Sequence, residues 1–282
     1  NKKTDLDPRF LRNFLAETVY EPGSTIKPMV MAAALELGVA KANEVVDCEH
    51  GRLVFARHVI NDVHPYDQIT FRDVLVRSSN IGMTKLGIRL GAQRLHSYLS
   101  SFGFGTASGL ALPGESRGLL RPVDKWAQVD IATHSYGQGF AVTPLQMVRA
   151  VASLANGGRV PSLSVVRSDT AFESRRVISE RSAQLVRDML FDVVEDEHGT
   201  GKQAKVEGIR VGGKTGTAQK PRKDGRGYDP GKYIASFVGF ADGSALGVRH
   251  MPTMVVIIDE PNTDTIYGGT LAAPVFKRIM QR

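Results

Sequence analysis

Cysteine is almost absent from this chain, and its scarcity excludes two kinds of small fold. Only Cys48 is present among the 282 residues. A disulfide framework and a cysteine-ligated metal cluster each need several cysteines at short spacing, so neither fits this sequence. The seven histidines are scattered and include no HExxH pair, the helical arrangement that binds catalytic zinc. We therefore expect no metal site and no cofactor.

Long apolar runs are missing as well. The longest, Met29 to Leu35, is far shorter than a membrane span and ends at Glu36. The chain starts at Asn1, without an initiator methionine and without the apolar core of a signal peptide. This start predicts a piece cut from a longer protein, with a membrane anchor left outside the 282 residues.

No dense stripe of one charge is present either. The formal net charge of +7 is spread along the chain. Its only local basic cluster is interrupted by proline and glycine and consists of Lys220, Arg222, Lys223 and Arg226. A nucleic-acid-binding domain usually has a denser basic face or a recognisable motif. We therefore expect no nucleic-acid partner, and we interpret the cluster as a solvated loop.

What the chain does contain is ordinary for a globular domain with a sizeable core: 42% hydrophobic and 23% charged residues. Apolar residues at three- and four-residue spacing predict helices over roughly 24–37, 70–77, 81–90, 92–102, 143–156 and 179–194. Short strand-like segments follow at 209–219, 233–241 and 253–259, and a closing helix at 272–281.

This order of elements predicts an α+β fold. Because no helix separates the three strands, they should pair as antiparallel neighbours, flanked by helices. We expect one domain over residues 1–282, with an all-helical subdomain over roughly 24–200 and the strands with the closing helix over roughly 205–282. Residues 1–23 show no convincing strand.

Ser24 and Lys27 form an SxxK pattern at the start of the first predicted helix. Residues three apart share a helix face, so the lysine amine can reach the serine hydroxyl and accept its proton. The pattern alone is weak, because an N-capping serine followed by a solvated lysine has the same letters. Pro22 and Gly23 favour the catalytic interpretation, since a tight turn would present the hydroxyl where backbone N–H groups stabilise negative charge.

Two further motifs follow in the chain. Ser78 and Asn80 form an SxN between two predicted helices, where a polar turn with Asn80 as a helix cap is the simpler explanation. The KTGT at 214–217 lies on a predicted strand, where a solubilising lysine on an edge strand is the simpler explanation. Gly216 would let another backbone or a ligand approach closely.

A phosphate-binding pattern, GxxxxGK[ST], overlaps the third motif from Gly208 to Thr215. That pattern needs an apolar strand before it and a helix after it, so that the phosphates meet a helix N-terminus. Here Gly216 and then Pro221 follow, and neither favours a helix. We therefore interpret this match as a coincidence.

Together and in this order, SxxK, SxN and KTGT resemble the signature of penicillin-binding proteins and serine β-lactamases. The chain is most similar to the transpeptidase domain of class B penicillin-binding proteins of the septal type. The likeness covers nearly the whole chain and also includes the segments 20–28, 136–139, 142–146, 237–241 and 272–276. It implies the penicillin-binding protein fold, and in this family a strand of the central sheet usually precedes the serine motif. The resemblance also implies an N-terminal pedestal module and a membrane anchor, which we expect to be absent from these 282 residues.

The resemblance implies a role for each motif residue. Ser24 would attack the carbonyl between two D-alanines of a peptidoglycan stem peptide, and β-lactams would acylate the same oxygen. Lys27 would act as base and Ser78 as proton relay, while the substrate would be held by Asn80, Lys214, Thr215, Gly216 and Thr217. The implied partners are lipid-linked glycan strands, a glycan polymerase and division proteins, at the outer face of a bacterial inner membrane.

Two alternatives share this fold and remain open. A β-lactamase or D,D-carboxypeptidase would resolve the acyl-enzyme with water, and Glu49 or Glu115 could then be the deacylating carboxylate. A penicillin-sensing domain would be acylated without transferring the acyl group. A non-enzymatic scaffold would require all three motifs to be accidental.

Overall fold

A computed structural model describes residues 12–110, 112–166, 173–222, 224–225, 227–248 and 250–282. Lys223 and Arg226 of the basic cluster lie outside this part of the chain. Within it, no helix has both the length and the apolar character that a bilayer crossing requires.

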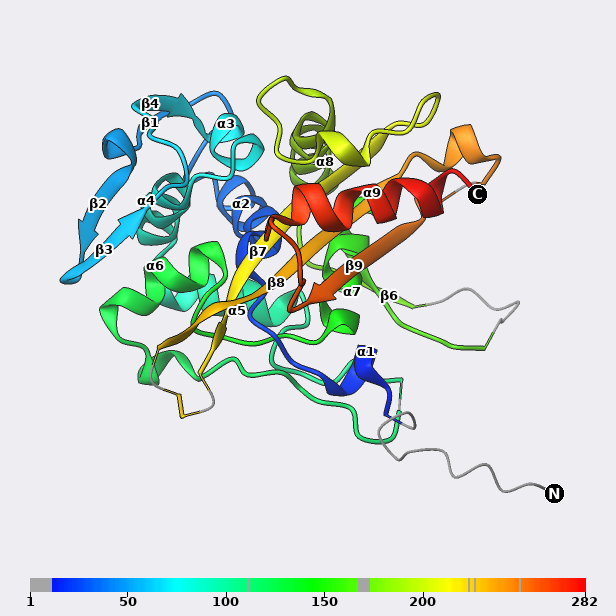
Figure 1. The fold of residues 1–282 in the computed structure, drawn as a ribbon, viewed down its shortest axis with the longest axis horizontal. Coiled ribbons are helices and arrows are strands. Elements are labelled where there is room, and N and C mark those ends of the chain that lie inside the picture. Colours follow the sequence, from blue (N-terminus) through cyan, green and yellow to red (C-terminus); the bar gives the residue numbers. More distant parts are fainter. Residues whose placement is uncertain (1–11, 111, 167–172, 223, 226, 249) are drawn as a thin grey trace.

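An antiparallel sheet crosses the molecule (Figure 1). Its strand order is β7–β8–β9, formed by β7 (Val211–Pro221), β8 (Tyr228–Ala241) and β9 (Thr253–Asp259). This confirms the prediction that the three strands pair as antiparallel neighbours. β8 begins five residues earlier than predicted, since its first residues carry Asp229, Pro230 and Gly231, which individually disfavour strands. These residues form part of the strand only because the pairing of β7 with β8 continues as far as Pro221 and Tyr228.

The side chains of β8 alternate between two hydrophobic clusters, as the period of a strand requires. Ile234, Val238 and Phe240 belong to the main core, whereas Phe237 packs edge-on against Phe276, with ring centroids 4.9 Å apart. Phe276 belongs to α9 (Gly268–Met280), which lies along one face of the sheet in Figure 1. The helices on the other side complete the main core, and both faces of the sheet are therefore covered.

The predicted helices are all present within a few residues. They are α2 (Lys27–Glu36), α3 (Phe71–Val76), α4 (Asn80–Leu90), α5 (Ala92–Ser101), α7 (Pro144–Ala155) and α8 (Glu180–Glu195). Thr70, Thr143 and Ser179 cap α3, α7 and α8 with their hydroxyls, as these residue types usually do. α2 is buried on every side from Lys27 to Ala34, so it forms the centre of the molecule.

Several elements were not predicted. They are α1 (Phe14–Glu17), α6 (Gln128–Tyr136), the paired strands β1 (Val45–Asp47) with β4 (Gln68–Thr70), β2 (Arg52–Phe55) with β3 (His58–Asn61), β5 (Arg159–Pro161) with β6 (Ser174–Arg176), and 3₁₀ turns at Gly23–Ile26, Glu49–Gly51, Val123–Lys125, Lys202–Ala204 and Gly243–Leu246. α9 starts at Gly268, whereas the sequence predicted a start at Ala272. The first turn was missed because it begins with two glycines, and Pro274 weakens the helical pattern further. Between residue 12 and Ser24 the described chain adds no strand to the sheet, and the rest of the segment considered in the sequence, residues 1–11, lies outside the described residues.

Candidate active site

Ser24 lies on a 3₁₀ turn, Gly23–Ile26, which leads directly into α2. Gly23 has a φ of +53°, a value that favours glycine, and its N–H donates to the carbonyl oxygen of Gly137 at 2.9 Å. A β-carbon on Gly23 would lie 3.3 Å from the β-carbon of Ala218 on β7. The turn that carries Ser24 is therefore clamped between the loop after α6 and the sheet, with Ser24 partly exposed.

Gly137 leaves no space at this clamp. A β-carbon there would lie 1.9 Å from the carbonyl oxygen of Gly23, and its φ is +99°. We expect Gly137→Ala to displace the turn and to lower the free energy of unfolding by roughly 3 kcal/mol or more. Gly208→Ala is the matched control, because Gly208 also has positive φ (+75°) but nothing near it. Its cost should be about 1 kcal/mol in the same denaturant titration. Equal effects of the two substitutions would contradict the clamp.

Lys27 is fully buried, and its amine joins the first motif to the second. The amine donates to the backbone carbonyl of Ser78 at 2.7 Å, to the hydroxyl of Ser78 at 3.2 Å and to Oδ1 of Asn80 at 2.8 Å. The SxxK spacing predicted that the amine can reach the Ser24 hydroxyl. In the described structure the hydrogen bonds of the amine go to the SxN segment, beside the turn that carries Ser24.

Burial lowers the pKa of Lys27 from 10.5 to about 7, against the opposing charge of Asp62. The ammonium form loses water contacts that its three acceptors replace only in part. A lysine with a pKa near 7 has a large neutral fraction at physiological pH, and a neutral amine can accept the proton of a serine hydroxyl.

Lys214 on β7 is also fully buried, which excludes the simpler explanation of a solubilising surface lysine. Its amine lies 3.4 Å from the hydroxyl of Thr215 and 3.5 Å from that of Thr200. Burial, and then the neighbouring charge of Lys27, place the pKa of Lys214 well below its usual value. A carboxylate bound at this amine would oppose both effects and favour the charged form.

Ser78 adopts a φ of +65°, a conformation that side-chain-bearing residues rarely occupy. This bend directs its carbonyl group toward Lys27. Ser79, not Asn80, caps α4, because its hydroxyl accepts from the N–H of Gly82 at 2.9 Å. Asn80 is thereby released from the capping role that the polar-turn explanation gave it, and its amide oxygen is available to Lys27.

Asp62, which the motifs did not identify, holds this segment in place. Its carboxylate accepts from the hydroxyl of Ser79 at 2.6 Å, from the N–H of Ile81 at 3.1 Å and from the N–H of Asn80. A carboxylate at a helix N-terminus also interacts favourably with the helix dipole. Asp62 follows β3 directly, so the contact exists only once the β2–β3 hairpin has packed against α4.

Two substitutions separate the bonds of Asp62 from its charge. We expect Asp62→Ala to lower the free energy of unfolding by about 2 kcal/mol, since three donors at the start of α4 lose their acceptor. Asp62→Asn keeps an acceptor oxygen but removes the charge that raises the pKa of Lys27. Any reaction that needs neutral Lys27 should then reach half of its maximal rate at a lower pH. An unchanged pH profile in Asp62→Asn would contradict this electrostatic link.

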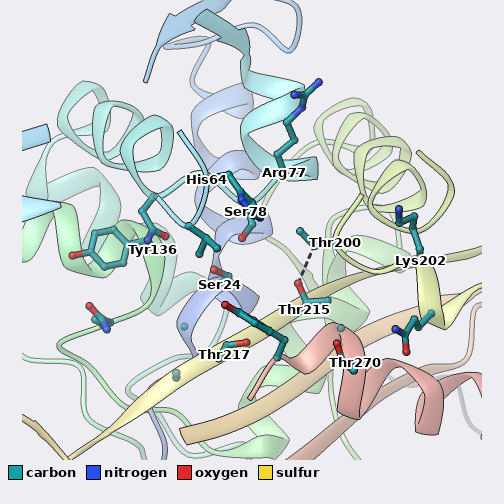
Figure 2. Close-up of a pocket in the computed structure, with 18 residues that line it drawn as sticks. Ser24, His64, Arg77, Ser78, Tyr136, Thr200, Lys202, Thr215, Thr217 and Thr270 are labelled. Atoms are coloured by element: carbon teal, nitrogen blue, oxygen red, sulfur yellow. Dashed lines mark hydrogen bonds between the residues drawn. The ribbon is translucent and has the colours of Figure 1, made fainter. Parts of the chain in front are cut away.

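The three motifs meet at a cavity of about 460 Å³. Figure 2 shows Ser24 in its centre, Ser78 on one side, and Thr215 and Thr217 of β7 on the other. Of the eight predicted site residues, Ser24, Ser78, Asn80, Thr215 and Thr217 line the cavity, whereas Lys27, Lys214 and Gly216 lie behind its wall. The sequence did not identify the remaining lining residues, among them Tyr136, Thr200 and Thr270.

Gly216 is required by close packing. A β-carbon at this position would lie 2.4 Å from the hydroxyl oxygen of Ser236 and 2.9 Å from the side chain of Thr25. Thr217 accepts a hydrogen bond from the N–H of Gly268 at 3.2 Å, which ties β7 to the start of α9. The glycine therefore allows β7 to lie directly against the Ser24 turn.

The competing explanations of the motifs find little support in this geometry. The segment from Gly208 runs into β7 and continues as strand beyond Thr215, so no helix follows the phosphate-loop pattern. Glu49 accepts from Lys85 at 2.5 Å and Glu115 from the N–H of Ser108 at 2.6 Å, and neither lines the cavity.

Among the described residues, no group of three or more His, Cys, Asp or Glu is arranged to hold a metal ion.

A serine on a turn, a buried lysine bound to a second serine, and a buried lysine on a facing strand form an arrangement that is typical of serine acyl-transfer proteins. Comparisons with known proteins identify the family. The family model named "Penicillin binding protein transpeptidase domain" matches residues 1–281. The chain belongs to this family, which confirms the resemblance drawn from the three motifs.

Named relatives agree with this assignment. The chain is 36% identical over 280 residues to the probable peptidoglycan D,D-transpeptidase PbpC of Pseudomonas aeruginosa, covering 99% of this chain and 48% of that protein. It is 37% identical over 270 residues to the peptidoglycan D,D-transpeptidase FtsI of Escherichia coli, covering 96% of this chain and 44% of that protein. The chain thus spans about half the length of the curated relatives it matches.

A solved structure confirms the fold. The transpeptidase domain of penicillin-binding protein 3 from Burkholderia pseudomallei superposes with a TM-score of 0.88 at 35% identity, covering 96% of this chain and 81% of that one. The predicted α+β fold of penicillin-binding proteins is therefore correct, including the antiparallel sheet with helices on both faces.

Proposed function

We propose that this chain is a peptidoglycan D,D-transpeptidase that works through an acyl-enzyme on Ser24. The observation that carries the proposal is the Lys27 amine, buried beside the Ser24 turn and bound to both Ser78 and Asn80. A neutral amine in this place can take the proton of Ser24 as its oxygen attacks a D-Ala-D-Ala carbonyl. Ser78 then gives its hydroxyl proton to the leaving D-alanine amine and takes in return the proton that Lys27 removed from Ser24.

The substrate is held from the other side of the cavity. The hydroxyls of Thr215 and Thr217 bind the terminal carboxylate of the stem peptide, and Asn80 binds its amide. Lys214 attracts the carboxylate from behind the cavity wall, where its amine lies 3.4 Å from the Thr215 hydroxyl. The backbone N–H groups of Ser24 and Thr217 stabilise the oxyanion of the tetrahedral intermediate. Gly216 keeps β7 close enough to the Ser24 turn for both donors to face one carbonyl. β-Lactams enter as mimics of the D-Ala-D-Ala end and acylate Ser24.

An amine of a neighbouring stem peptide, rather than water, resolves the acyl-enzyme. Supporting this choice, Glu49 and Glu115, the two carboxylates considered for deacylation, do not line the cavity. The names of the relatives, D,D-transpeptidases including FtsI, point the same way. By the same likeness, the whole protein works at the outer face of the inner membrane in septal wall synthesis, on lipid-linked glycan strands and alongside a glycan polymerase and division proteins.

The test offers an acyl-D-Ala-D-Ala peptide together with a D-amino acid as acceptor and separates the products by mass. A transpeptidase yields the peptide with the new amino acid at its end, and it turns over nitrocefin slowly or not at all. Hydrolysis without exchange would instead indicate a carboxypeptidase, and rapid nitrocefin turnover a β-lactamase. Stable penicillin labelling without either product would indicate a penicillin-sensing domain.

A further inference from the structure

The segment before Ser24 runs beside the loop that follows α6. Tyr20 and Val142 exchange two backbone hydrogen bonds of 3.0 and 2.9 Å, and Gly23 donates to Gly137 at 2.9 Å. Between these contacts lies Glu21, a carboxylate that the acyl-transfer mechanism does not use. Its side chain is not part of the cavity wall.

The carboxylate of Glu21 connects three separate segments. One oxygen accepts from the backbone N–H of Gly139 at 3.0 Å, and the other accepts from the hydroxyl of Tyr228, the first residue of β8, also at 3.0 Å. Burial raises the pKa of Glu21, and these two hydrogen bonds oppose the rise. Glu21 is therefore a bridging group inside the protein rather than a solvated surface charge.

We propose that Glu21 is a positioning residue for acylation, which holds the Ser24 turn in register with β7. The inference rests on the proposed function, because it concerns the same reaction. The turn packs closely against β7, since a β-carbon on Gly23 would lie 3.5 Å from the carbonyl oxygen of Thr217. A small shift of the turn therefore changes the distance between the two proposed oxyanion donors, the backbone N–H groups of Ser24 and Thr217. Tyr228 pairs with Pro221 of β7, and Glu21 thus links the turn to the same hairpin that carries Thr217.

The experiment measures acylation by a fluorescent penicillin in stopped flow, separating the non-covalent dissociation constant from the rate constant of acylation. Glu21→Ala should lower the rate constant on the order of tenfold, because both hydrogen bonds are lost. Glu21→Gln should restore it to within about threefold of wild type, since its amide can accept from Gly139 and donate to the Tyr228 oxygen. The rate constant of Tyr228→Phe should lie between those of the two Glu21 variants. The non-covalent dissociation constant should stay unchanged in all three variants.

Glu36→Gln is the matched control for a merely structural role. Glu36 also bridges two donors, the N–H and hydroxyl of Ser179 at 2.9 and 2.6 Å, but at the far end of α2. The Glu36→Gln variant should have a lower melting temperature but an unchanged rate constant of acylation. Glu21→Ala acylated within twofold of wild type, or slowed no more than Glu36→Gln, would overturn the inference. A wild-type protein that takes no label would instead contradict the proposed function.

Discussion

Alanine in place of Lys27 is expected to slow the acylation of Ser24 by roughly 10²- to 10⁴-fold, the range in which loss of a general base usually falls. The amine is the group that joins the SxxK and SxN motifs, through the carbonyl and hydroxyl of Ser78 and the amide of Asn80. Without it, Ser24 has no proton acceptor at the end of its turn. The measurement is the second-order rate constant for labelling by a fluorescent penicillin.

Lys27→Met is the matched variant, because it keeps most of the buried volume but has no amine. Burial that lowers the pKa of Lys27 from 10.5 to about 7 disfavours the folded state by on the order of 5 kcal/mol below pH 7. That penalty disappears as the pH rises from about 7 toward 10.5. We therefore expect Lys27→Met to remain folded at pH 7 while acylating as slowly as Lys27→Ala. Acylation at the wild-type rate in either variant would show that Lys27 is not the base.

The pH profile of the wild-type protein provides an independent check. Only the neutral amine accepts a proton, so the acylation rate should fall tenfold for each pH unit below about 7 and become constant above it. A rate that is constant from pH 5 to pH 9 would contradict the assignment of Lys27 as base.

Ser24→Ala should abolish acylation altogether, since the variant lacks the hydroxyl oxygen on which the acyl group is proposed to form. The substitution should be nearly neutral for folding, because it removes one hydroxyl from a partly exposed position on a turn whose backbone is fixed by Gly23 and Gly137. Circular dichroism and the melting temperature check that the variant is folded. An unfolded Ser24→Ala protein would contradict this view of the turn.

The three motifs could be found in the sequence because the chemistry proposed for them depends on residue type and order. Ser24, Lys27, Ser78, Asn80 and the KTGT strand were identified in this way. The sequence could not show that Lys27 reaches Ser78, because that contact depends on how α2 packs against α4. Local spacing predicted only the Ser24–Lys27 pair.

The supporting carboxylates could not be predicted for the same physical reason. Asp62 and Glu21 act through partners far away in the chain, Ser79 and Tyr228, and neither belongs to a local pattern. α6 was missed because its nine residues have weak amphipathicity and bury polar side chains such as Asp130 and His134. Patterns of apolar residues identify helices that cover a core, and α6 is buried partly through polar contacts.

The most direct test of the central claim is to identify the atom that penicillin acylates. The protein is incubated with penicillin, digested, and analysed by tandem mass spectrometry, with Ser24→Ala treated in parallel. We expect a single penicilloyl adduct on the peptide that contains Ser24 and no adduct in Ser24→Ala. An adduct on any other residue, or label that persists in folded Ser24→Ala, would contradict the assignment of Ser24 as the nucleophile.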